Sequence, residues 1–170
     1  MSLGKQLVAL LLTSLSLMAV EYSAVVNKVV DGDTLHVVIG KSTEKIRILF
    51  IDTPEKYGGS KLEKDSKKAG ISADKEQELG KLSSLYAAKF FQIGDHVIVN
   101  SNKKDQYGRM LGTVSKGGLD YSRQVIADGY SCIYKKAPYP REFETLLQSA
   151  KESKKGLWSV DFTTMAKLCR

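Results

Sequence analysis

Three short runs near the start of the chain, each rich in β-branched residues, set narrow limits on its architecture. They occupy residues 23–30, 34–39 and 45–51 and are separated by two tight turns, Asp31-Gly32-Asp33 and Gly40-Lys41-Ser42. Runs this short, bounded by glycine and polar turn residues, are typical of strands. We therefore expect three consecutive antiparallel β-strands.

A helical pattern begins at Asp74, after a segment of different character. Residues 56–73 are rich in Lys, Gly and Ser, and they predict a long exposed loop. Asp74 and Gln77 then form a plausible capping box, and Gly94 is expected to stop the helix. Its apolar face is predicted to carry Leu79, Leu82, Tyr86, Phe90 and Ile93.

The second half of the chain predicts two more strands and two more helices. The strands are expected at residues 96–100 and 110–115, and a short helix at residues 120–128. Pro140 opens a last helix, which stops at Gly156. This order predicts an α+β fold, a five-stranded Greek-key barrel of the oligonucleotide-binding (OB) type with three helices.

The charge of the chain indicates a polyanionic partner. Its 170 residues suit a single domain, and they carry 26 Lys and Arg against 19 Asp and Glu, a net charge of +7. Such an excess favours nucleic acid or an anionic membrane surface as the partner.

The N-terminus resembles an export signal. Lys5 precedes an apolar stretch at residues 7–20, and Leu17-Met18-Ala19 approximates a signal-peptidase site, although Leu17 is large. We predict a signal peptide at residues 1–19, a single mature domain at residues 20–170, and an exported, periplasmic or secreted protein. The alternative is an uncleaved membrane anchor, although the stretch is short for spanning a bilayer.

The two cysteines allow two interpretations. In an oxidising compartment Cys132 and Cys169 could pair and tie the C-terminal tail to the fold. Alternatively, Cys132 is buried and Cys169 carries a free thiol. Neither has the spacing of a metal ligand.

Acidic residues at two predicted turns suggest a metal site. Asp33 lies in the first turn, and Asp52 and Glu55 follow the third strand on either side of Pro54. Because Ca²⁺ prefers oxygen ligands, Asp33, Asp52 and the Thr53 carbonyl would make a partial shell for it. Such an ion polarises a phosphodiester, while Glu55 could take a proton from water.

Two arginines could bind the charge of a phosphate. Arg47 lies on the third strand, and Arg109 follows Tyr107 and Gly108 in the turn before the fifth strand. A guanidinium can bind two phosphate oxygens at once, and Tyr107 offers a hydroxyl or a ring face to the substrate. Taken singly, these features also fit structural roles, an ordinary hairpin turn for Asp33 and a barrel-rim arginine for Arg47.

Together, three motifs resemble those of the staphylococcal nuclease (thermonuclease) family. They are DGDT at residues 31–34, RILFIDTPE at residues 47–55 and DQYGR at residues 105–109, and the resemblance covers about residues 23–159. It implies a Ca²⁺-dependent phosphodiesterase that cuts DNA and RNA with little sequence preference and leaves 3′-phosphate ends.

The resemblance also implies roles for individual residues. Asp33, Asp52 and the Thr53 carbonyl match the family's metal ligands, and Glu55 matches its acidic residue, whose role as base or water-ordering group is contested. Arg47 and Arg109 match its phosphate-binding arginines, and Tyr107 a nucleotide-contacting tyrosine.

Three departures from the family pattern bear on the substrate site. Gln106 stands where the best-known member has a lysine, and the loop after Glu55 is longer. An expected pair of aromatic residues aligns cleanly with none of Tyr130, Tyr134 and Tyr139.

The sequence thus predicts an exported nuclease whose partners are DNA and RNA, with no obligate protein partner and a monomeric state. The main alternative is a non-catalytic OB-fold protein that binds nucleic acid. A basic membrane-surface protein is a third reading, and it rests on the charge and the apolar N-terminus alone.

Overall fold

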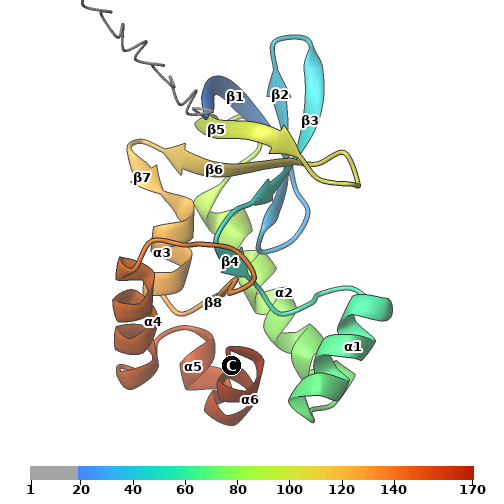
Figure 1. The fold of residues 1–170 in the computed structure, drawn as a ribbon, viewed down its shortest axis with the longest axis vertical. Helices are drawn as coiled ribbons and strands as arrows, with labels where there is room; N and C mark the ends of the chain where they lie inside the picture. The colour runs from blue at the N-terminus through green and yellow to red at the C-terminus, as the bar shows by residue number, and fades with distance from the viewer. Residues whose placement is uncertain (1–18) are drawn as a thin grey trace, which may run out of the picture.

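A closed five-stranded barrel forms the body of the protein in the computed structural model, which describes residues 19–170 (Figure 1). Its strands are β1 (Val20–Val29), β2 (Thr34–Ile39), β3 (Ser42–Ile48), β5 (His96–Lys104) and β6 (Met110–Lys116). They pair in the order β3-β2-β1-β5-β6, and a parallel pairing between β3 and β6 closes the sheet on itself. This confirms the predicted OB-type barrel in an α+β fold.

Apolar side chains at alternate positions of each strand fill the barrel. Leu35 and Val37 of β2, Ile46 of β3, Val99 of β5 and Val114 of β6 are all fully buried. Residues two apart on a strand face the same side, so each strand contributes a row of side chains to one shared core.

The third predicted strand, residues 45–51, is divided in the structure. β3 ends at Ile48, and a separate short strand, β4 (Ile51–Asp52), leaves the barrel to pair with β8 (Cys132–Ile133). Between them Phe50 adopts a φ of 70°, which is rare for a bulky residue. Backbone bonds hold the kink, since Leu49 N–H donates to Gly112 and Tyr134 N–H donates to Phe50.

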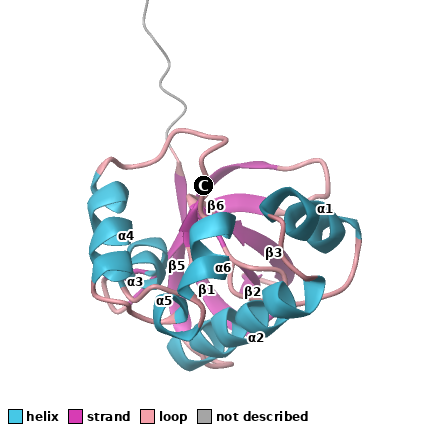
Figure 2. Ribbon diagram, turned by 90° about the horizontal axis from the view of Figure 1, so that it is seen from below, coloured by secondary structure: helices cyan, strands magenta, loops and turns pink. Residues whose placement is uncertain are grey.

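Helix α2 (Ala73–Phe90) corresponds to the first predicted helix, with corrections at both ends. Ser72, not Asp74, caps it, because the Ser72 hydroxyl accepts a hydrogen bond from Lys75 N–H at 3.4 Å. The helix ends before Gly94, and Ile93 lies outside it with 77% of its surface exposed. The buried face carries small residues beside Leu79, which lets α2 lie close to the barrel (Figure 2).

The prediction of a long loop at residues 56–73 is wrong, because this segment contains helix α1 (Ser60–Ala69). Only Leu62 and Ser66 of this helix are buried, so few apolar residues mark it as a helix in the sequence. Gly70 ends it in a left-handed conformation with φ of 63°, and Lys67 and Lys68 favour the last turn through the helix dipole. α1 contacts both α2 and α6.

The C-terminal third contains four helices rather than the two expected there. α3 (Tyr121–Ala127) and α4 (Glu142–Glu152) match predictions, although α4 begins after Pro140. The short helices α5 (Leu157–Val160) and α6 (Phe162–Leu168) are additional, as is the two-residue strand β7 (Leu119–Asp120). With α1, six helices replace the three predicted within residues 19–170.

The disulfide interpretation of the cysteines is confirmed. Cys132 and Cys169 are bonded, with a sequence separation of 37, so the tail is tied to β8. The predicted signal peptide lies outside the described residues except for Ala19. None of the helices within residues 19–170 has the length and apolar character needed to cross a membrane.

Candidate active site

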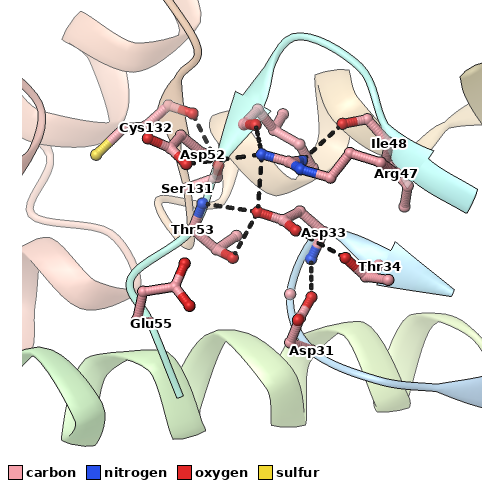
Figure 3. Close-up of polar contacts among 12 residues, drawn as sticks. Asp31, Asp33, Thr34, Arg47, Ile48, Asp52, Thr53, Glu55, Ser131 and Cys132 are labelled. Atoms are coloured by element: carbon pink, nitrogen blue, oxygen red, sulfur yellow. Dashed lines mark hydrogen bonds and ion pairs between the residues drawn. The ribbon is translucent and has the colours of Figure 1, made fainter. Parts of the chain in front are cut away.

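Arg47 is the centre of a cluster at one end of the barrel (Figure 3). Its Nη1 donates to the Ile48 carbonyl at 2.9 Å and its Nη2 to the Ile51 carbonyl at 3.0 Å. The same Nη2 lies 3.2 Å from Asp33 Oδ2 and 3.6 Å from Asp52 Oδ1. The kink at Phe50 turns the chain so that these groups surround one guanidinium.

Asp33 is held in one orientation by its neighbours. Its Oδ1 accepts the Thr34 hydroxyl at 3.1 Å, and its Oδ2 accepts Thr53 N–H and Oγ1–H at 3.3 and 3.1 Å. Burial alone would raise the pKa of Asp33, but Arg47, Lys61 and the Thr53 hydrogen bonds outweigh it and lower the pKa. Asp33 is therefore a fixed, ionised carboxylate.

Asp52 is less well satisfied. Among the described residues, its buried Oδ1 atom has no hydrogen-bond partner and forms ion pairs with Arg47 at 3.6 Å and Lys61 at 3.5 Å. Burial raises the pKa of Asp52 despite those two cations. A buried carboxylate oxygen with spare lone pairs is suited to a further cation.

Asp31 is a third carboxyl group of the cluster, and it was not among the predicted site residues. Its Oδ1 accepts Asp33 N–H at 3.0 Å. Burial and the adjacent Asp33 charge raise the pKa of Asp31 to about 6. Its place in the DGDT motif was the available signal, since the backbone turn brings residues two apart together.

Glu55 is paired with Lys61 of α1, the helix in the segment that was predicted to be a loop. The Lys61 ammonium contacts the Glu55 carboxylate and also lies 3.5 Å from Asp52 Oδ1 and 3.4 Å from Asp65 Oδ2. Burial lowers the pKa of Lys61, but Asp52 and Glu55 more than reverse this and raise it well above its usual range. One ammonium therefore joins Glu55 to the Asp52 side of the cluster.

Helix α2 supports the backbone beneath this cluster. Glu76 Oε1 accepts Glu55 N–H at 3.4 Å, and burial raises the pKa of Glu76 to about 7. Gly80 lets the backbone at Glu55 lie close against α2, because a Cβ at residue 80 would lie 2.4 Å from the Glu55 carbonyl carbon. At Gly32 a Cβ would lie 2.7 Å from Thr53 Cγ2, so glycine allows a close approach both in helix α2 and in the turn before β2.

Arg109 and Tyr107 lie in the turn between β5 and β6, apart from the Arg47 contacts. Arg109 Nε and Nη2 both lie 2.9 Å from Asp105 Oδ2, and the Arg109 guanidinium lies 5.7 Å from the Tyr107 ring centre. Within residues 19–170, no hydrogen bond or ion pair joins Arg109 to Asp33, Asp52 or Glu55. Leu111 of β6 pairs with Arg47 of β3 in the parallel register. The turn that carries Arg109 therefore leads into the strand beside β3.

The predicted metal ligands Asp33, Asp52 and Thr53 lie together at this end of the barrel. Across the described part of the chain, no three His, Cys, Asp or Glu side chains group closely enough to hold a metal by themselves. Asp33 and Asp52 both lie close to the Arg47 guanidinium, and Thr53 follows Asp52 directly. Carboxylates are the hard oxygen ligands that Ca²⁺ prefers, and a calcium site here stays a prediction.

The tyrosines expected near the substrate have separate placements. Tyr130 stacks on Tyr86 with ring centres 4.5 Å apart, and the Tyr139 hydroxyl donates to Glu144. Tyr134 follows β8, the strand that pairs with Asp52. Of the three, Tyr134 is therefore connected most directly to the cluster.

Comparison with known proteins identifies the family. The sequence model described as "Staphylococcal nuclease homologue" matches residues 45–160. Endonuclease YhcR of Bacillus subtilis (strain 168) is 33% identical over 150 residues, which is 82% of this chain but 12% of that protein. The chain thus corresponds to a small part of that relative's length.

Shorter relatives are covered more fully. An uncharacterized endonuclease of Escherichia coli O157:H7 is 29% identical over 133 residues, 78% of this chain and 74% of that protein. Endonuclease YncB of Bacillus subtilis (strain 168) is 28% identical over 138 residues, 78% of this chain and 60% of that protein. With a family match over residues 45–160 and this barrel, the chain belongs to the staphylococcal nuclease homologue family.

Proposed function

We propose that this chain is a metal-dependent nuclease that hydrolyses phosphodiester bonds of DNA and RNA with little sequence preference. The observation that carries the proposal is the Arg47 cluster, in which one guanidinium is fixed between two carboxylates beside Glu55. Family membership and the names of the endonuclease relatives support the same activity.

Arg47 has a free edge for a phosphate. Hydrogen bonds within residues 19–170 engage its Nη1 and Nη2, and none engages Nε. The Nε–H group can therefore donate to a phosphate oxygen while the rest of the guanidinium stays fixed. A donor oriented in advance stabilises developing charge without reorganisation.

Arg109 and Tyr107 are proposed to bind the same substrate from the β5–β6 turn. Asp105 orients the Arg109 side chain, and Tyr107 has 73% of its surface exposed. An exposed ring can stack on a base without reading its identity, which agrees with low sequence preference.

Asp33, Asp52 and the Thr53 carbonyl are proposed to hold Ca²⁺. When bound, the ion would polarise the scissile phosphate and orient a water molecule. Lys61 currently neutralises the Asp52 and Glu55 oxygens, so Glu55 must exchange this partner before it can accept a proton from water. Glu55 then acts as general base or as the group that orders the water.

We also propose that the protein is exported and acts as a monomer, as its sequence predicts. The Cys132–Cys169 disulfide supports export, because such bonds persist outside the reducing cytosol.

The test is cleavage of single-stranded DNA and RNA in millimolar Ca²⁺, with and without a chelator. We expect shortening only with Ca²⁺, products with 3′-phosphate ends, and loss of cleavage but not of binding in Glu55→Gln. Binding without cleavage in Ca²⁺ would overturn the proposal and leave the non-catalytic OB-fold binding protein.

A further inference from the structure

A hollow of about 220 Å³ opens directly beside Asp52 and Thr53. Its walls come from α1, from β8 and the residues after it, and from the C-terminal helix α6. We call it the basic hollow, because the side chains that line it include Tyr134 and five cations, Lys68, Lys135, Lys136, Lys167 and Arg170.

Within residues 19–170, none of the five cations of the basic hollow takes part in a salt bridge. Arg47, Lys61 and Arg109 all do. Three acidic residues also line the basic hollow: Asp52 and Asp65 are bound by Lys61, and Glu76 accepts a hydrogen bond from Glu55 N–H. Unpaired positive charge therefore faces solvent next to the proposed scissile site.

The C-terminal wall of the basic hollow is fixed in place. The Cys132–Cys169 disulfide ties it to β8, Lys167 Nζ donates to the Gly70 carbonyl at 3.2 Å, and Lys135 Nζ donates to the Cys169 carbonyl at 3.5 Å. Helix α6 contacts α1 across the opening, and both figures of the whole chain place them side by side. The disulfide and these hydrogen bonds therefore hold the backbone that carries Lys135, Lys167 and Arg170 in place.

This wall lies beyond the segment that the family model matches. That match ends at residue 160, whereas α6 (Phe162–Leu168), Cys169 and Arg170 follow it. The basic hollow is therefore built partly from residues that the family match does not include.

We propose that the basic hollow binds the phosphates of a single nucleic-acid strand on one side of the scissile phosphate. Single strands are held by positive grooves that follow the backbone, together with aromatic rings that accept any base. Lys136 lies 6.0 Å from the centre of the Tyr134 ring, so ring and charge occur together. The inference rests on the proposed nuclease function and adds a strand-binding subsite to it.

The test is the salt dependence of binding to an oligothymidylate of about 20 nucleotides, longer than many single sites require. Chelator is present throughout, so that no cleavage is needed. Each lost phosphate contact should reduce the slope of log affinity against log salt by about 0.7. The double variants Lys135→Gln/Lys136→Gln and Lys167→Gln/Arg170→Gln should therefore each flatten the slope by about 1.4.

Two controls distinguish the loss of charge at the basic hollow from the loss of charge anywhere on the protein. A variant with three exposed lysines elsewhere neutralised, Lys41→Gln/Lys81→Gln/Lys154→Gln, should keep nearly the wild-type slope although it loses more charge. Lys135→Arg/Lys136→Arg, which keeps both charges, should also keep it. If the control triple variant flattens the slope as much as the two test variants, the basic hollow is no subsite.

Cleavage of long and short substrates provides an independent readout. With Ca²⁺, the test variants should raise KM for the long oligothymidylate roughly tenfold, and leave kcat and KM for a thymidine dinucleotide unchanged. Equal effects on both substrates would overturn the inference. If the wild-type protein cleaves neither, the proposed function fails, and the salt slopes alone still decide whether the basic hollow binds the strand.

Discussion

The two arginines proposed to bind the phosphate are held in contrasting ways. Arg47 has a side-chain exposure of 15% and contacts two carbonyls and two carboxylates that come from separate strands and turns. Arg109 has an exposure of 31%, and its hydrogen bonds and ion pairs go to Asp105 in its own turn. One arginine is part of the folded core of the site, and the other belongs to a hairpin at its edge.

This difference separates stability from activity. Removing a residue that neutralises buried carboxylates should damage the fold together with the reaction. Removing a residue held only by its own exposed turn should damage the reaction alone. Variants of Arg47, of Arg109 and of its partner Asp105 test this division.

The largest effect is expected for Arg47→Met. It leaves Asp33 buried beside fewer cations, so the free energy of unfolding should fall by about 3–5 kcal/mol. Turnover should fall roughly 10²–10³-fold or more, because a fixed phosphate donor is lost. Urea denaturation and cleavage rates measure the two losses.

Arg47→Lys is the matched variant, since it keeps the charge but not the planar fork. It should retain more stability than Arg47→Met and still lose most turnover. Equal unfolding midpoints for the wild type and Arg47→Met would contradict the structural role of Arg47.

Arg109→Ala should reduce turnover by a similar roughly 10²–10³-fold and change the free energy of unfolding by less than about 1 kcal/mol. Arg123→Ala is its control, because Arg123 also forms an exposed ion pair, with Glu142. That control should alter neither quantity. A loss of stability in Arg109→Ala comparable with Arg47→Met would remove the distinction between the two arginines.

Asp105→Asn should have a smaller effect on turnover, roughly tenfold, since Arg109 remains but is less well oriented. Burial acts to raise the pKa of Asp105, but hydrogen bonds from Arg109 and Tyr107 lower it below the usual 3.8. Ionised Asp105 therefore stabilises the folded turn above that pH, and this stabilisation is lost as the pH falls. Turnover measured for both proteins checks the effect, and unchanged turnover would show that Arg109 needs no orientation by Asp105.

The smallest expected change, on the order of 1–2 kcal/mol, is a gain of stability in Glu76→Gln. Burial raises the pKa of Glu76 from 4.5 to about 7, so the native state keeps a proton that the unfolded chain releases. Wild-type stability therefore falls as pH rises through this window, whereas the glutamine cannot titrate and keeps an acceptor for Glu55 N–H.

The gain in Glu76→Gln should grow between about pH 4.5 and 7 and then level off, as measured by urea denaturation at several pH values. Glu78→Gln, an exposed change on the same helix, serves as the control and should leave the free energy of unfolding close to that of the wild type. A gain that is the same at pH 4 and pH 8 would argue against the raised pKa of Glu76.

The sequence predicted the parts of the site that depend on local turns. Strand periodicity located the barrel, and the turn motifs pointed to Asp33, Arg47 and Asp52, which the structure brings together. Their proposed roles in catalysis remain predictions. Local signals were sufficient here because each of these residues lies at the end or the edge of a strand.

The missed features depend on contacts between distant segments. Helix α1 buries too little apolar surface to be recognised, so the position of Lys61 among three carboxylates had no sequence signal. The positive φ of Phe50 depends on bonds to Gly112 and Tyr134, far along the chain. Glu76 could have been found, since it lies three residues before Leu79 on the buried face of α2.

The disulfide is connected to the site through one residue pair of the β4–β8 ladder. Cys132 is the direct pairing partner of Asp52, and its bond to Cys169 encloses α4, α5 and α6 in one covalent ring. A newly made chain with both thiols reduced lacks the tie that holds this ring against β4. Oxidation therefore closes this ring at β8, directly beside the strand that carries a proposed metal ligand, and such bonds form and persist in oxidising compartments.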